Sequence, residues 1–358
     1  MADLALQKLA LNAILSLPTP ILRMLSGGGV VHKGGRTLDP HFQLMAAQAK
    51  GQPPMSSVTA VEARMAAKAG FALASARPEP GVRWEARVLD GPDGPVPTRV
   101  YRPDNQDPDM PALTWLHMGG GVIGDLETCH AFCTVLAKTI RCAVISVDYR
   151  LAPEHRYPAG LDDSMFAYRF VRDHAADFGA PEGQAAIGGD SMGGYFSAII
   201  AQDLKAAGEP QPSYALLIYP CVDVASETPS MTLHADTYPL TRDTMNWFMA
   251  QYLSADADPA TPRLSPIRAA DLSGLAPTLV VTAGFDPLSD QGEDYAKRLM
   301  AAGVPTVFRS YDSLPHGFTG FGALPAADRA CREIAALARR AATGDLFRAT
   351  QDPGATGP

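Results

Sequence analysis

A serine lies between two glycines in residues 189–193, which read Gly-Asp-Ser-Met-Gly. An apolar segment precedes this motif and an alanine-rich segment follows it, so the sequence predicts a strand, a sharp turn and a helix. The hydroxyl of Ser191 would stand at the turn as a nucleophile. Side chains at Gly189 and Gly193 would collide with the neighbouring backbone there. The alternative is chance, which yields the pattern about once in seven chains of this composition.

Residues farther along the chain favour the catalytic interpretation. A serine nucleophile needs a histidine as general base and an acid that orients its ring, in the chain order serine, acid, histidine. Asp286 follows the apolar segment 278–283, and His316 follows the next one. The sequence therefore predicts Ser191, Asp286 and His316 as a catalytic triad. The remaining histidines precede the acid and fail this order: His32, His41, His117, His130, His155, His174 and His234.

Asp290 is the alternative acid. Its position before Gln-Gly-Glu favours a helix N-cap, so Asp286 is preferred.

A glycine-rich loop could stabilise the charge that the reaction develops. Residues 117–121 read His-Met-Gly-Gly-Gly and directly follow the apolar segment 112–116. In this kind of site, such a loop donates backbone N–H groups to the oxyanion together with the residue after the nucleophile, here Met192. A plain glycine turn is the alternative. The serine motif downstream favours the oxyanion role.

These segments need a scaffold, and the pattern from Val82 onward predicts one. Apolar strands alternate with helices, which is typical of a largely parallel sheet covered on both faces. Together with the serine turn between a strand and a helix and the order of the triad residues, this pattern indicates the α/β-hydrolase fold. The expected strands are 83–89, 96–102, 112–117, 142–148, 185–189, 214–219, 278–283 and 306–310. The expected helices are 128–140, 159–178, 192–207, 242–253, 290–302 and 326–342.

Two stretches interrupt this alternation. Residues 1–80 are expected to be helical with loops and no strand, and residues 222–272 are inserted between two strands. Such segments usually cover a site, so we expect a helical cap over a catalytic core of 81–221 and 273–345. Residues 346–358 are expected to be a flexible tail. The uncharged run 9–22 is too short to span a bilayer, and a docked cap helix is favoured over a helix lying on a membrane.

Composition excludes several functional classes. The 358 residues carry a formal net charge of −8 without a Lys/Arg run, which argues against nucleic acid as a partner. The five cysteines form no C-x-x-C pair, so neither a zinc site nor a disulfide framework is indicated. The start of the chain lacks a secretion signal, and a cytoplasmic location is expected. No metal or organic cofactor is required.

Several motifs, taken in order, resemble the hormone-sensitive-lipase-like carboxylesterases, the bacterial family IV lipolytic enzymes. They are the glycine loop 117–121, Asp-Tyr-Arg-Leu-Ala-Pro-Glu-His at 148–155, Gly-Asp-Ser-Met-Gly-Gly at 189–194, Asp-Pro-Leu-Ser-Asp at 286–290 and His-Gly-Phe at 316–318. The resemblance covers most of the chain. It implies an eight-stranded core, a helical cap, hydrolysis of short- to medium-chain esters, and oxyanion donors at Gly119, Gly120 and Met192.

The resemblance has three departures. The family usually has glycine where Met118 stands, an aromatic residue where Gly121 stands, and alanine where Met192 stands. A flexible thioether at 192 could reshape the pocket without altering the backbone N–H. The run 149–154 is expected to support the site, with Arg150 held by buried carboxylates.

The sequence thus predicts a serine carboxylesterase that forms an acyl-enzyme. An amidase, a formamidase or a lactonase could use the same triad, and a binding receptor of this fold is a further alternative that the presence of His316 disfavours. Possible pocket residues are Met118, Tyr219, Trp247 and Phe248, although aromatic residues at such positions are as often core. The expected partner is a small ester, and residues 306–310 could pair two copies as an edge strand.

Overall fold

The computed structural model describes residues 2–351. At its centre lies an eight-stranded sheet in the order β10-β9-β8-β7-β5-β6-β4-β3. Neighbouring strands are parallel except that β4 runs antiparallel to β3 and β6. The strands are β3 (Val82–Gly91), β4 (Gly94–Pro103), β5 (Ala112–Leu116), β6 (Val144–Val147), β7 (Ala185–Asp190), β8 (Ala215–Ile218), β9 (Thr278–Phe285) and β10 (Thr306–Pro315). The expected α/β-hydrolase fold is confirmed.

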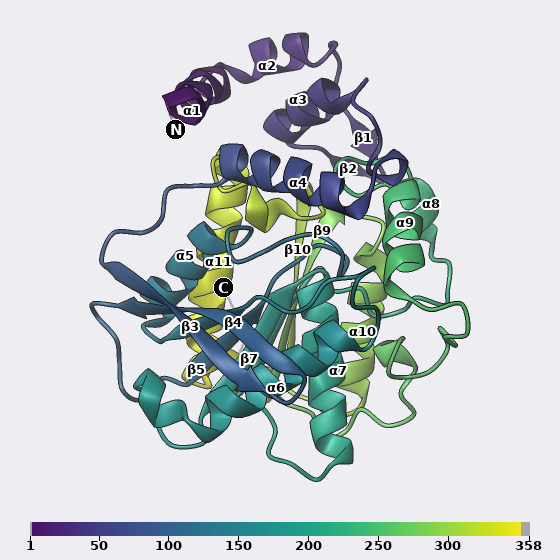
Figure 1. Cartoon of the computed structure of the whole chain (residues 1–358). Helices are drawn as coiled ribbons and strands as arrows, with labels where there is room; N and C mark the ends of the chain where they lie inside the picture. Colours follow the sequence, from purple (N-terminus) through teal and green to yellow (C-terminus); the bar gives the residue numbers. More distant parts are fainter. Residues whose placement is uncertain (1, 352–358) are drawn as a thin grey trace.

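Helices cover both faces of the sheet, because its central strands are apolar on both sides (Figure 1). One face packs against α5 (His130–Ile140) and α11 (Pro325–Ala342), which also contact each other. The other packs against α6 (Ala159–Asp173), α7 (Met192–Ala206) and α10 (Ser289–Ala301). Each of these helices begins and ends within two residues of its predicted bounds, except that α6 ends five residues before its predicted end and a separate 3-10 turn follows it. The short 3-10 turns are η1 (Met55–Ser57), η2 (Ala175–Phe178), η3 (Pro266–Arg268) and η4 (Phe318–Gly320).

The N-terminal segment stacks at one end of the molecule, with α4 between the sheet and the elements that precede it (Figure 1). Its helices are α1 (Ala2–Leu15), α2 (Thr19–Leu25), α3 (Pro40–Ala49) and α4 (Ala60–Ala74). The expectation of no strand here was wrong. His32–Lys33 (β1) pairs with Arg36–Thr37 (β2), because Gly34 and Gly35 both adopt the positive φ that a two-residue hairpin turn requires.

Within residues 2–351, no single helix has the length and apolarity needed to cross a membrane. Only α1 and α2 taken together meet that test, and they are bent by 116° at their junction.

Residues after β8 form an insertion that carries α8 (Pro229–Leu233) and α9 (Arg242–Tyr252) before the chain returns to β9. At the C-terminus, the expected start of a flexible tail at residue 346 was wrong. Asp345–Gln351 form α12, whose Leu346 and Phe347 are buried in the same core as α11. Apolar packing therefore keeps these residues helical. The rest of the expected tail lies outside the described residues.

Candidate active site

Ser191 occupies the sharp turn between β7 and α7. It has φ 53° and ψ −114°, a strained conformation for a residue with a side chain. A Cβ on Gly193 would lie 1.8 Å from the carbonyl oxygen of Leu116, and one on Gly189 would lie 2.4 Å from the backbone of Gly193. Only glycine fits at these two positions, as the motif predicted. The turn therefore holds the serine hydroxyl beyond the carboxyl end of the sheet.

The structure brings the three predicted triad residues into one hydrogen-bonded row. The Nε2 atom of His316 lies 2.8 Å from the Oγ atom of Ser191, and its Nδ1 atom lies 2.8 Å from Oδ2 of Asp286. Because β9 ends at Phe285 and β10 at Pro315, both side chains emerge at the same edge of the sheet. The other carboxylate oxygen of Asp286 accepts from the N–H of Leu288 at 2.8 Å, which fixes its orientation. Ser191 is only 9% exposed.

The glycine loop lies beside this row. Gly119, Gly120 and Gly121 have φ of 128°, 62° and 72°, so each adopts a backbone conformation that favours glycine. No hydrogen bond within residues 2–351 uses the N–H of Gly119 or Gly120. The N–H of Met192 lies in the first turn of α7, where no helical carbonyl can accept it. These are the three N–H groups that were predicted as oxyanion donors.

Of the predicted pocket residues, Phe248 and Met118 contact site loops. A Cβ on Gly120 would lie 2.3 Å from the Phe248 ring, so α9 rests directly on the glycine loop. Met118 is buried against the loop that follows His316, and a Cβ on Gly320 would lie 2.7 Å from its Cε. Trp247 packs on Phe248, with ring centroids 5.4 Å apart.

Tyr219 packs beside the histidine and takes part in a polar cluster that the sequence did not reveal. Its ring centroid lies 4.7 Å from that of His316. Its hydroxyl contacts the hydroxyl of Thr319, and both donate to the buried carboxylate of Asp190, at 3.3 and 2.5 Å respectively. Asp190 precedes the nucleophile, and Thr319 follows the histidine by three residues. The cluster therefore ties the serine turn to the histidine loop.

Burial raises the pKa of Asp190, although hydrogen bonds from Thr319 and Cys129 and the nearby His117 oppose this. No Lys or Arg in residues 2–351 forms an ion pair with this carboxylate. The thiol of Cys129 lies 3.6 Å from its Oδ1 atom. Asp190 is thus a buried acid held by neutral donors.

Residues 148–155 support the glycine loop, chiefly through the side chain of Tyr149. The hydroxyl of Tyr149 donates to the carbonyl of His117 at 2.7 Å, and their rings stack with centroids 4.2 Å apart. The guanidinium of Arg150 donates to both carboxylate oxygens of the buried Asp163 and, at 3.4 Å, to Asp93. The expectation of buried carboxylates holds for Asp163, while Asp93 is exposed.

Arg64 of α4 anchors the N-terminal segment to the same region. Its guanidinium donates to the carbonyls of Val122 and Ala152 and to both carboxylate oxygens of Glu154. The hydrogen bond from Arg64 lowers the pKa of Glu154 to about 2. Nothing in the sequence around Arg64 indicates this contact, because its partners are 58 to 90 residues away.

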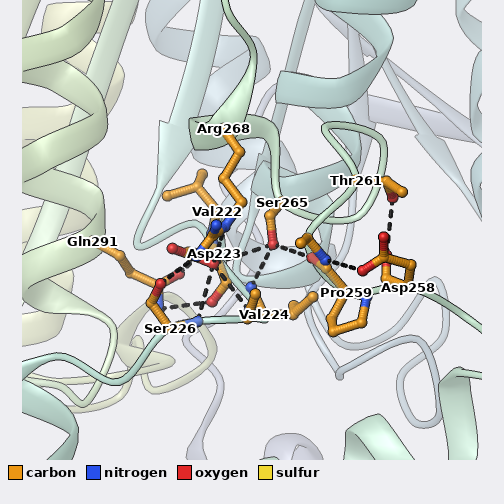
Figure 2. A network of polar contacts seen from close by, with 12 residues as sticks. Val222, Asp223, Val224, Ser226, Asp258, Pro259, Thr261, Ser265, Arg268 and Gln291 are labelled. Atoms are coloured by element: carbon orange, nitrogen blue, oxygen red, sulfur yellow. Dashed lines mark hydrogen bonds and ion pairs between the residues drawn. The ribbon is translucent and has the colours of Figure 1, made fainter.

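A second polar cluster ties both ends of the insertion to α10 (Figure 2). The Oδ1 atom of Asp223 accepts from the hydroxyl of Ser265 and from Nε of Arg268, both at 3.2 Å. Gln291 of α10 accepts from the N–H groups of Val222 and Asp223 at 2.6 and 3.0 Å. Although burial opposes it, hydrogen bonds and the charge of Arg268 lower the pKa of Asp223. We call Asp223, Ser265, Arg268 and Gln291 the hinge cluster.

The alternative acid, Asp290, does not orient the histidine. It does not cap its own helix either, because α10 begins at Ser289 and Asp290 lies in its first turn. Its carboxylate accepts from the N–H of Ser230, at the start of α8, at 2.7 Å. It thus caps a helix of the insertion, a contact that local sequence does not reveal.

Comparisons with known proteins agree with this architecture. Residues 113–320 match the Abhydrolase_3 family, described as alpha/beta hydrolase fold. The chain is 42% identical over 315 residues to the carboxylic ester hydrolase LipN of Mycobacterium tuberculosis, covering 84% of this chain and 82% of LipN. It is 35% identical over 275 residues to an ethyl acetate hydrolase of Pseudomonas putida, covering 76% and 86%.

Among solved structures, the hyperthermophilic esterase of Pyrobaculum calidifontis is 35% identical, with a TM-score of 0.80 and coverage of 86% of this chain and 99% of that one. An ester hydrolase from the Lake Arreo metagenome is 39% identical, with a TM-score of 0.80 and coverage of 83% and 96%. Family match, overall identity and fold agree, and the chain belongs to the hormone-sensitive-lipase-like, family IV branch of the α/β-hydrolases.

Proposed function

We propose that this chain is a serine carboxylesterase in which Ser191 is the nucleophile, His316 the general base and Asp286 the residue that orients the histidine. The observation that carries the proposal is the row of two 2.8 Å hydrogen bonds from Asp286 through His316 to Ser191. The names of the relatives, which include carboxylic ester hydrolases and esterases, support an ester as substrate.

The reaction follows from the geometry. The Oγ atom of Ser191 attacks the ester carbonyl carbon while its proton passes to Nε2 of His316, and Asp286 stabilises the resulting imidazolium. The carbonyl oxygen becomes an oxyanion that accepts from the N–H groups of Gly119, Gly120 and Met192. When this intermediate collapses, the C–O bond of the ester breaks, and His316 returns the proton to the departing alcohol. Water then attacks the acyl-enzyme with the same histidine as base, and the acid leaves.

The test is ester hydrolysis by a Ser191→Ala variant. Turnover of an aryl ester is expected to fall by about 10⁶-fold, as in other serine triads, with the fold unchanged by circular dichroism. Covalent labelling by a fluorophosphonate should occur in the wild type and be lost in the variant. Ester turnover that persists in Ser191→Ala would contradict the assignment, and a wild type that neither labels nor turns over esters would favour a receptor.

We propose short- to medium-chain esters as the preferred substrates, because the relatives include an ethyl acetate hydrolase, whose substrate is a short-chain ester. On this proposal, residues 1–80 and 222–272 act as the cap over the catalytic core. Aryl esters of increasing acyl length, assayed beside a matched amide and a lactone, test this preference. Faster turnover of the amide or lactone would identify the enzyme as an amidase or lactonase.

We also propose a cytoplasmic location and a homodimer formed through the edge strand β10. The five cysteines form no disulfide, which suits a reducing compartment. The strand β10 has one neighbour, β9, so its other side can pair with a second copy along Thr306–Ser310. Ser310→Pro would block such pairing, and a monomeric wild type in sedimentation equilibrium would contradict it.

A further inference from the structure

Exposed apolar side chains gather in the N-terminal segment. Of the thirteen large hydrophobic residues most exposed in the described part of the chain, seven fall within residues 4–30. Leu6, Leu9 and Met24 are exposed at 66%, 67% and 67%. We call these three, with Ile21, Leu25 and Val30, the N-terminal apolar patch. Its residues lie on and just after α1 and α2, at the end of the molecule farthest from the sheet (Figure 1).

This surface is not the ordinary outer face of an amphipathic helix. In α1, Leu11 and Leu15 are buried in the core, yet the residues on the other side of the helix include Leu6 and Leu9 instead of charged residues. Lys8 and Asn12 separate these two apolar sides, so α1 carries an exposed apolar face in addition to its buried one, and such a face is normally covered by protein or lipid. One side of α1 therefore has no apolar partner within residues 2–351.

The charge of the same stretch indicates the partner. Between Asp3 and Asp39 the chain contains four Lys or Arg and no Asp or Glu, although the whole chain has 38 acidic residues and a net charge of −8. Two of these cations are neutralised, Lys33 by Asp236 and Arg36 by Asp312. Lys8 and Arg23 belong to no ion pair within the described residues. They are the cations closest in sequence to the exposed leucines and methionine.

Arg23 is placed to bind an anion beside the apolar side chains. It lies in α2 next to the exposed Met24, and both line an open hollow with Pro20 and residues 27–30. Its Nε atom is buried and has no hydrogen-bond partner in the structure. A buried donor without an acceptor is costly, and the side chain as a whole is only partly buried, so an oxygen anion in the hollow can pair with the charge of its guanidinium.

We propose that this end of the molecule binds to the surface of an anionic membrane. The N-terminal apolar patch would enter the boundary between headgroups and acyl chains, and Lys8 and Arg23 would pair with lipid phosphates. The segment would lie on the bilayer without spanning it, because α1 and α2 are bent by 116°. A second copy of the chain suits the surface less well, since its own residues 4–38 would bring further cations and no acid.

Vesicle flotation of the full chain tests this proposal. The probes are vesicles of phosphatidylglycerol with phosphatidylcholine and vesicles of phosphatidylcholine alone. We expect the wild type to float with the anionic vesicles and to be released by salt. Lys8→Gln with Arg23→Gln should weaken the partition coefficient about 30-fold. Leu6→Glu with Leu9→Glu and Met24→Glu should weaken it more than about 100-fold.

The matched control replaces exposed apolar residues elsewhere, as Val88→Glu with Met300→Glu. Its binding should equal that of the wild type, and all variants should keep ester turnover, which shows that they fold. The proposal fails if the wild type stays in solution with anionic vesicles, or if the control loses as much binding as the patch variant. It also fails if sedimentation equilibrium shows that the wild type is a dimer and that only the patch variant is monomeric, because a second copy would then cover this surface.

Discussion

Two of the three departures from the family pattern, Gly121 and Met192, can be explained by the contact between them. A Cβ on Gly121 would lie 2.9 Å from Cε of Met192 and 2.9 Å from the ring of Tyr252. The methionine after the nucleophile therefore occupies space that a larger residue at 121 would need. The family usually has the larger residue at 121, an aromatic, and the smaller at 192, alanine. In this chain the larger residue is at 192 and the smaller at 121, so the two departures compensate each other in volume.

Gly121→Ala tests this coupling at the residue scale. The substitution forces a side chain into φ 72° and against Met192, so we expect kcat/KM to fall at least about tenfold. Adding Met192→Ala should recover part of the loss, because one of the two close contacts disappears. Gly303→Ala is the control, since it has φ 77° and no atom near the added Cβ, and it should leave kcat/KM unchanged. Equal losses with and without Met192 would contradict the coupling.

The buried acid beside the nucleophile predicts a pH dependence of stability. Because the pKa of Asp190 is raised in the folded chain, the folded state binds more protons than the unfolded state between the ordinary aspartate value, about 4, and the raised value. Stability must therefore fall as the pH rises through that window. Asp190→Asn lacks this dependence.

Urea unfolding at a series of pH values measures this pH dependence of stability. The free energy of unfolding of the wild type, relative to that of Asp190→Asn, should decrease from about pH 4 upward and level off above the raised pKa. A difference that stays constant with pH would contradict a raised pKa, and one that increases would indicate a lowered pKa.

The site residues that could be predicted from the sequence are those whose type, order along the chain and position after a strand follow a local rule. Ser191 was predictable because its two glycines and its place between a strand and a helix fit a strained turn, and Asp286 and His316 because they come after strands in the required order. The positioning residues Thr319 and Arg64 were not predictable. Thr319 meets Asp190 across 129 residues of chain, and no short motif encodes a hydrogen bond of that span.

At the scale of elements, the hinge cluster decides where the insertion lies. Figure 2 shows the hydroxyl of Ser265 between Asp223 and the backbone of Val224 and Pro259, so the two ends of the insertion are joined to each other. Gln291 joins the first of these ends to α10, which begins three residues after Asp286. The insertion carries α9, and α9 places Phe248 on the glycine loop.

Asp223→Ala should therefore affect both stability and catalysis. Removing an acceptor of four hydrogen bonds from a buried cluster should lower the free energy of unfolding by about 2 to 3 kcal/mol. It should also lower kcat/KM, because α9 loses a fixed attachment. Asp256→Ala is the control, since Asp256 is an exposed acid in the same insertion. A loss of stability with normal kcat/KM would show that the hinge cluster stabilises the fold without affecting the active site.

Element bounds followed from the sequence within about two residues wherever apolar periodicity was continuous, as in seven of the eight strands of the sheet. The exception is β10, which was expected to end at Ser310 and continues to Pro315. The bounds failed where an element is short or is held by distant packing. The hairpin of β1 and β2 has two residues in each strand, too few for any period. The helix α12 follows a glycine and looks terminal, yet the burial of Leu346 keeps it in place.

For the molecule as a whole, the site is assembled from segments of unequal stability. Its nucleophile turn is anchored in the core formed by β5 and β7, where Trp115 is fully buried. Its covering elements, α4 and α9, bury only a few side chains in the core, such as Ala63 and Phe248, and are also attached by partly exposed polar contacts such as that of Arg64 with Glu154. Local opening of such elements requires less free energy than unfolding of the sheet.

We therefore expect ester turnover to be lost at a lower urea concentration than the concentration at which the fluorescence of Trp115 changes. In a Trp84→Phe, Trp247→Phe variant, Trp115 is the remaining tryptophan and reports on the sheet alone. Its emission should change only in the main transition, whereas turnover of the same variant should already be lost, because displacement of α9 or α4 leaves the glycine loop unsupported. Coincident midpoints would mean that core and covering elements unfold as one cooperative unit.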